Sequence, residues 1–168
     1  MKTFIIAENQ RGLLVKDGRL VQVLGPGRHF YWLWDSRRMQ VEIDFAHGAC
    51  NLPQVDGIEK RHTELAEANF EIVAPQQGQV AIVRTDGRAT LIVRGGDVAR
   101  VWKVLDEIAV DVIDVEAEPK LSKRLLNELG NASVAGRLAP SPVEAIAVGE
   151  AQSAIVLFDG ELFETVGS

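Results

Sequence analysis

Hydrophobic and polar residues alternate along much of the chain in short runs that are typical of β-strands. The clearest pattern is a pair of apolar runs at 11–16 and 19–24, joined by Asp17 and Gly18. Asp-Gly between two such runs predicts a β-hairpin, because a type I′ turn needs a positive φ at both central positions. A further strand is expected at 3–7. The N-terminal part of the chain is therefore predicted to form a small antiparallel β unit.

This hairpin pattern occurs three times. The second copy occupies 79–93, and its Asp86 follows Asp17 at an offset of 69 residues. The third copy begins at 153 and contains Asp159. Self-similarity at a fixed spacing is the sequence signature of repeated structural units. We therefore interpret the chain as an internal duplication followed by a partial third unit.

Two further matches extend the duplication beyond the hairpins. Trp102 follows Trp32 at an offset of 70 residues, which implies a one-residue insertion after Gly96. At the same offset, the Ile-Asp dipeptide at 113–114 matches the Ile-Asp dipeptide at 43–44. We expect these pairs to occupy equivalent places in the two units.

Two helices are expected, one after each β unit. The first covers 58–69, with few apolar positions, and is predicted to be mostly solvated. The second opens at Glu118 and Pro119, because proline is favourable at the first helical position. Its leucines form an amphipathic stripe, and Gly130 is its expected C-terminal cap.

Together these elements predict an α+β, β-rich fold, in which small antiparallel β units repeat in tandem and each is followed by a helix. The first unit spans 1–69 and the second spans 70–139. A linker with the partial third unit spans 140–168, and Pro140-Ser141-Pro142 marks the linker.

Strict alternation between 39 and 45 predicts a half-buried strand. The apolar positions expected to face the core are Met39, Val41, Ile43 and Phe45. The positions expected to face solvent are Gln40, Glu42 and Asp44. A solvent-facing side of a strand accounts for these carboxylates without acid–base catalysis.

An aromatic run with arginines beside it follows the first hairpin. We expect Phe30, Trp32 and Trp34 to share one strand face and to form the core of the first unit. Tyr31 and Leu33 then lie on the opposite face, and if they are exposed they mark a protein contact surface.

The charge of the chain argues against a generic nucleic-acid-binding role. Its 168 residues include 18 Lys and Arg and 24 Asp and Glu, for a net charge of −6, whereas such a role needs a basic surface. The charge is also uneven. Residues 1–50 contain seven basic and five acidic residues, so the rest of the chain contains 11 basic and 19 acidic ones.

Cys50 is the single cysteine, so no intramolecular disulfide can form, which suits a reducing compartment. The apolar start of the chain is too short for a signal peptide, and no apolar run approaches the ~18–20 residues that cross a bilayer. We expect a cytoplasmic protein, with peripheral attachment at the inner face of the membrane as the alternative.

No constellation of catalytic residues is expected. His47, Cys50 and His62 have an H-x2-C-x11-H spacing, but structural zinc sites show paired ligands on both sides. The serines lie in linker or terminal stretches, without the context of a nucleophile elbow. The Gly-Pro-Gly stretch at 25–27 has no N–H on its proline to offer a phosphate, and no helix follows it. We therefore expect no enzyme, no metal and no cofactor.

The motifs of the repeat resemble a known family. The segments that carry the resemblance are Glu8 to Arg19, Gly25 to His29, Trp32, and Val41 to Asp44. They are similar to the N-terminal portion of bacterial slipins, the stomatin-like members of the SPFH or band-7 family, in which small β-rich units precede the SPFH domain. The segment from Val148 to Leu162 resembles the start of that domain. The resemblance stops before the body of the SPFH domain, so it implies a non-catalytic interaction module rather than a membrane scaffold.

We therefore expect a non-enzymatic scaffold or adaptor that binds protein partners and associates with itself through the 143–168 hairpin. An isolated hairpin is marginally stable, and its open edge is a template for association. The alternative is a peripheral membrane module that uses the aromatic and arginine-rich strand 28–38, and a metal-binding enzyme or sensor ranks last. The candidate interaction surface consists of Arg28, Tyr31, Leu33, Arg37, Arg38, Ile155, Leu157, Leu162 and Val166.

Overall fold

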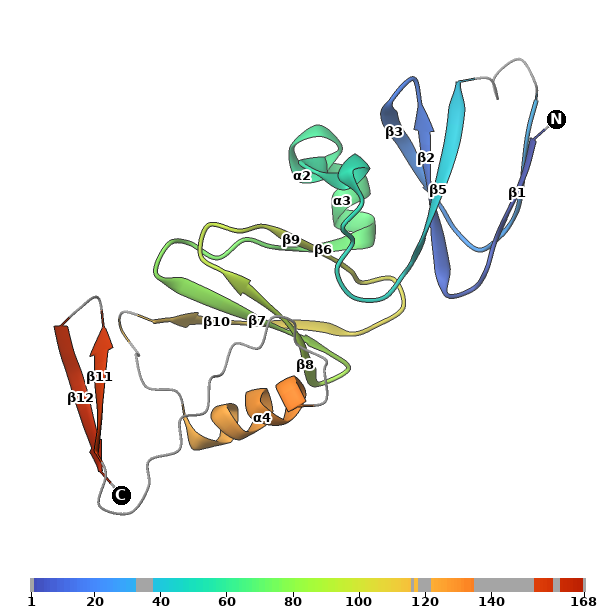
Figure 1. Ribbon diagram of the computed structural model, residues 1–168. Helices are drawn as coiled ribbons and strands as arrows, with labels where there is room; N and C mark the ends of the chain where they lie inside the picture. The colour runs from blue at the N-terminus through green and yellow to red at the C-terminus, as the bar shows by residue number, and fades with distance from the viewer. Residues whose placement is uncertain are drawn as a thin grey trace.

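The computed structural model describes residues 2–32, 38–115, 117, 122–134, 153–158 and 161–167. For 130–134, 153–158 and 161–167 the description is of the backbone. In these parts the chain is β-rich, with several small antiparallel sheets and short helices (Figure 1). The predicted β-rich α+β class is confirmed at this level.

The chain begins with a two-stranded ribbon that packs on a three-stranded sheet. The first ribbon pairs β1 (Lys2–Ile6) with β4 (Gly27–Tyr31) in antiparallel orientation. The first sheet has the order β3-β2-β5 and contains β2 (Gln10–Lys16), β3 (Arg19–Leu24) and β5 (Met39–Phe45).

The turn between β2 and β3 has the predicted geometry. Asp17 and Gly18 have φ values of 51° and 76°, and Asp86 and Gly87 have values of 50° and 76°. Positive φ at both central positions is what a type I′ hairpin requires. The strongest signal in the sequence therefore produces two hairpins with closely similar turns.

A helical segment lies between the two β units. It contains the 3₁₀ turn η1 (Pro53–Val55), α2 (Ile58–Arg61) and α3 (Thr63–Asn69). The single helix expected over 58–69 is wrong in one respect: the chain leaves helical geometry at His62, where φ is −145° and ψ is 64°. The segment is also less solvated than expected, because Ile58 and Ala66 are buried in the main core.

A second ribbon and a second sheet follow the helical segment. The second ribbon pairs β6 (Phe70–Val73) with β9 (Ala99–Trp102). The second sheet has the order β8-β7-β10 and contains β7 (Gln79–Thr85), β8 (Arg88–Arg94) and β10 (Ile108–Asp114).

The C-terminal part contains one helix and one hairpin. Helix α4 spans Lys123–Val134, so Gly130 lies inside it and the predicted cap at that residue is wrong. A glycine inside a helix costs about 1 kcal/mol relative to alanine, which neighbouring turns can offset. The third hairpin is present, with β11 (Ser153–Phe158) antiparallel to β12 (Glu161–Gly167). The predicted linker at 140–142 lies outside the described residues.

The elements are stacked in layers, each of which shares a hydrophobic cluster with the next (Figure 1). The first ribbon and the first sheet enclose a cluster that includes Ile6, Leu14 and Met39. The other face of the first sheet, the helical segment and the second ribbon share a larger cluster that includes Leu13, Ile58 and Trp102. The helical segment therefore lies between the two β units.

The stack continues in the same order through the second unit. The inner face of the second ribbon packs on the second sheet through Val73, Val101 and Val83. The far face of the second sheet is covered by α4, because Leu129 is buried with Ile82 and Ala89. The order of layers is therefore first ribbon, first sheet, helical segment, second ribbon, second sheet and α4.

Burial on both faces of the first sheet corrects the expectation for residues 39–45. Met39 and Val41 face the first ribbon as predicted, but Ile43 and Phe45 are 44% and 59% exposed. The polar face is only partly solvated, since Gln54 Nε2 donates to Glu42 Oε1 at 2.6 Å. Alternation predicted the strand correctly, but it did not show that the polar face would have a covering layer.

The tight approach of the β8 end to the turn before β7 gives a stability prediction. A Cβ at Gly95 would lie 2.3 Å from the carbonyl oxygen of Gln76 and 2.9 Å from that of Gln79. These are backbone atoms, so Gly95→Ala is expected to lower the free energy of unfolding by about 1–3 kcal/mol. The measurement is the midpoint of urea unfolding.

The matched control is Gly25→Ala. A Cβ there would have no atom within 4 Å, so stability should stay unchanged or rise slightly, because alanine restricts the unfolded chain. Equal losses in the two variants would contradict the close approach at Gly95.

Candidate interaction surface

The outer face of the first ribbon carries exposed apolar side chains. In an antiparallel pair, residues opposite each other point to the same face, and Thr3 pairs with Phe30 while Ile5 pairs with Arg28. On this face Ile5, Phe30 and Trp32 are 66%, 54% and 78% exposed. We call Ile5, Arg28, Phe30 and Trp32 the ribbon face. It is an apolar surface that no described layer covers.

The opposite face of the same ribbon is the buried one. Ile6 is buried and Tyr31 packs partly against the same cluster as Leu14. The rings of Phe4 and Tyr31 meet edge to face with centroids 6.0 Å apart. The first sheet therefore packs on the side of the ribbon that carries Tyr31.

This arrangement reverses the prediction for the aromatic run. Phe30 and Trp32 were expected in the core and are exposed, whereas Tyr31 was expected on the other face and is partly buried. Trp34 lies outside the described residues. Strand periodicity placed Phe30 and Trp32 together on one face, but it could not say which face would meet the first sheet.

The remaining residues of the predicted interaction surface are only partly placed. Arg28 belongs to the ribbon face, and Arg38 is exposed, with its Nε 3.7 Å from Asp17 Oδ1. Leu33 and Arg37 lie outside the described residues. The predicted residues of the third hairpin lie in β11 and β12, where only the backbone is described: Ile155, Leu157, Leu162 and Val166.

The second ribbon presents its corresponding face to the helical segment instead of to solvent. Phe70 pairs with Trp102 across this ribbon, and both side chains are almost fully buried. Their ring centroids are 4.2 Å apart. Trp102 Nε1 donates to Asp44 Oδ2 at 3.0 Å, so the buried indole N–H has a partner in the first unit. The expected solvent-facing role of Asp44 is therefore wrong, because it anchors this tryptophan.

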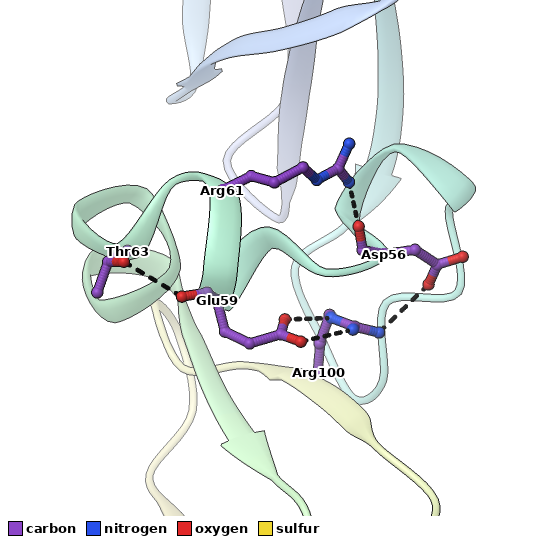
Figure 2. A network of polar contacts seen from close by, with 5 residues as sticks. All are labelled: Asp56, Glu59, Arg61, Thr63 and Arg100. Atoms are coloured by element: carbon purple, nitrogen blue, oxygen red, sulfur yellow. Dashed lines mark hydrogen bonds and ion pairs between the residues drawn. The ribbon is translucent and has the colours of Figure 1, made fainter.

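An ion-pair network holds the helical segment on the second ribbon (Figure 2). Arg100 Nε and Nη2 donate to the two carboxylate oxygens of Glu59 at 3.0 and 3.1 Å. Arg100 Nη1 also donates to Asp56 Oδ1 at 3.2 Å. Bidentate pairing of this kind fixes orientation as well as charge, because the planar guanidinium matches the carboxylate.

Two further contacts brace the same network. Arg61 Nη2 donates to the carbonyl oxygen of Asp56, and Thr63 Oγ1 donates to that of Glu59 at 3.2 Å (Figure 2). The hydrogen bonds from Arg100 hold the pKa of Glu59 below its usual value. The network therefore favours the ionised carboxylate and joins residues about forty positions apart in the chain.

The residues considered as metal ligands serve other roles. His47 Nδ1 lies 2.8 Å from Asp106 Oδ2, which joins the two units at the surface. Cys50 is buried in the main core, and burial raises the pKa of its thiol to about 12. Within the described residues, which include His47, Cys50 and His62, no group of three His, Cys, Asp or Glu side chains could hold a metal ion.

Sequence reasoning missed two parts of this site. Ile5 was placed in a strand, but its exposure depends on which side of β1 meets the first sheet. The pairing of Arg100 with Glu59 was also missed, because it joins a strand to a helix across 41 positions. The available signal was the duplication itself, since Trp32 and Trp102 match and their surroundings could be compared.

Comparisons with protein-family models, with curated proteins and with solved structures find no match. Among the described residues, no helix has the length and apolar character needed to cross a membrane.

The Glu59–Arg100 pair predicts a pH-dependent loss of stability. Because the pKa of Glu59 is lowered in the folded state, its contribution is complete above the ordinary value of 4.5 and is lost as the pH falls through the folded value. Glu59→Gln is expected to lower the free energy of unfolding at pH 7 by about 1–3 kcal/mol. The difference from the wild type should shrink in urea unfolding below pH 4.5.

Glu67→Gln is the matched control, because Glu67 lies on the exposed side of α3. A difference between wild type and Glu59→Gln that stays constant down to acidic pH would contradict the role of the carboxylate.

The burial of Cys50 predicts an unreactive thiol. The thiolate is the reactive form, and a pKa of about 12 leaves very little of it at neutral pH. A chromogenic disulfide reagent should therefore react slowly with the folded protein and rapidly in concentrated urea. Equally fast reaction in both conditions would show that this part of the core is open.

Proposed function

We propose that this protein is a non-enzymatic scaffold or adaptor module that acts through protein–protein contacts and associates with itself. The observation that carries the proposal is the ribbon face, where Ile5, Phe30 and Trp32 are exposed together. Tryptophan, other aromatic residues and arginine are enriched at the centres of protein interfaces. Arg28 lies on the same face, opposite Ile5.

The proposal includes a tandem-repeat architecture, supported by backbone contacts that recur at an offset of 69. Gln10 N donates to Ala7 O and Gln79 N donates to Gln76 O, both at 3.0 Å. Close to the hairpin turns, Asp17 N donates to the carbonyl oxygen of residue 38, and Asp86 N to that of residue 107.

The strand registers refine the expected alignment. Tyr31 pairs with Lys2 and Val101 pairs with Glu71, which keeps the offset of 70 in β4 and β9. In the last strand of each unit the offset returns to 69, since residues 45 and 114 pair with residues 10 and 79. The expected match of the two Ile-Asp dipeptides is therefore shifted by one residue.

Repeated units of this kind bury their faces against their neighbours, so the ends of a stack are sites of association. The resemblance to the N-terminal region of slipins supports the same non-catalytic role. We also propose that the third hairpin, β11 and β12, contributes to association, because a two-stranded hairpin is marginally stable alone.

A second candidate is peripheral association with a membrane. It is favoured by Trp32 and Phe30 beside Arg28, since aromatic rings and arginines suit the headgroup region. The net charge of −6 opposes it at an anionic surface. We therefore rank it second.

Self-association predicts a molar mass above that of one chain. Light scattering on a sizing column should give a mass above 18.4 kDa that rises with protein concentration. A variant that ends at residue 142 tests the share of the third hairpin, and a partial loss of mass is expected. A mass of 18.4 kDa at every concentration would overturn self-association.

A further inference from the structure

We propose that the ribbon face of one copy of this chain binds α4 of a second copy, on the side of α4 that carries Leu126. The proposal rests on the proposed self-association and names the two surfaces that meet. It predicts head-to-tail assembly, because the two surfaces lie at opposite ends of the stack of layers (Figure 1).

The chain itself contains one complete example of this kind of contact. The second ribbon turns Phe70 and Trp102 toward the helical segment, where they are buried with Ile58 and Ala66. The same helical segment also covers the first sheet, through Leu13 and other residues of the main core. A helix layer in this fold is thus enclosed between the sheet before it and the ribbon after it.

Each end of the described stack has half of this arrangement. At one end, the first ribbon presents the ribbon face without a helical layer, and Trp32 is exposed at the position that matches buried Trp102. At the other end, α4 covers the second sheet as the helical segment covers the first. Ile82 and Ala89 pack against α4, and they follow Leu13 and Leu20 at the offset of 69.

Helix α4 has an apolar side chain available for such a contact. Leu129 is buried and Leu125 partly buried against the second sheet, whereas Leu126 is 41% exposed. Successive residues of a helix point about 100° apart, so Leu126 lies away from the centre of the sheet contact. It can therefore take the place that Ile58 and Ala66 have against the second ribbon.

Charge favours a second copy of this chain as the occupant. Residues 1–50 have a net charge of +2, and the remaining residues have a net charge of −8. In head-to-tail contact, the basic end of one copy meets the acidic part of the next, whereas contact between two first ribbons would place basic ends together. An anionic membrane would attract the first ribbon but repel the rest of the chain.

The geometry makes the interface heterologous, because the two surfaces that meet are different. Such interfaces form rings when the rotation between copies closes and open filaments when it does not. A self-complementary dimer would instead use the same surface twice.

The first experiment compares the solution masses of exposed-surface variants. Phe30→Thr/Trp32→Thr should shift the assembly to the mass of one chain, and Leu126→Gln should do the same. Phe45→Thr is the control, because Phe45 is as exposed as Phe30 but lies outside the ribbon face. Circular dichroism and urea unfolding should confirm that each variant is folded. If either the ribbon-face variant or Leu126→Gln is folded and keeps the wild-type mass, the proposal is overturned.

The second experiment mixes the two defective variants. The ribbon-face variant still offers α4, and Leu126→Gln still offers the ribbon face, so the mixture should form a dimer and no larger species. Absence of a dimer in the mixture would overturn head-to-tail contact, even if each variant is monomeric alone.

The same variants distinguish the other occupants. A wild-type chain that stays monomeric at every concentration would overturn the proposed self-association itself. If wild-type assembly persists in both variants, self-association stands, and the contact proposed between ribbon face and α4 is overturned. Co-sedimentation with phosphatidylserine-containing vesicles that requires Phe30 and Trp32, without self-association, would assign the ribbon face to a membrane instead.

Discussion

A two-stranded β-ribbon needs a cover on its faces, and this constraint shapes the whole arrangement. The second ribbon meets the requirement twice, with Val73 and Val101 against the second sheet and Phe70 and Trp102 against the helical segment. The hydrogen bond from Trp102 to Asp44 extends the contact to the first sheet. One buried aromatic pair therefore holds together two β units that are otherwise separate sheets, and the ion pairs of Arg100 fix the helical segment across it.

Local signals in the sequence were sufficient to predict the hairpins. The Asp-Gly turns at 17–18 and 86–87 have positive φ at both positions, and the strands on each side of them form as expected. Turn chemistry acts over neighbouring residues, so it can be recognised without knowledge of the rest of the fold. The helix positions were predicted less well, since His62 interrupts one helix and Gly130 does not end the other.

The candidate site could not be predicted in the same way, because burial is a property of layers. Trp32 and Trp102 are the same residue type at matching positions, yet one is 78% exposed and the other is fully buried. The difference comes from the helical segment, which precedes the second ribbon and covers it. Alternation identifies the two faces of a strand, but which face is covered depends on segments far away in the chain.

The order of layers also has a consequence for synthesis on the ribosome. Each layer packs on layers close to it in the chain: the first sheet can bury its cluster with the first ribbon as soon as β5 has emerged. The helical segment then leaves before β6 and β9, so a nascent chain exposes Leu13 and Ile58 until Trp102 arrives. Domains generally fold from the N-terminus during translation. The growing end of this chain is thus the aggregation-prone one, and completion of the second ribbon is the step that closes its largest core.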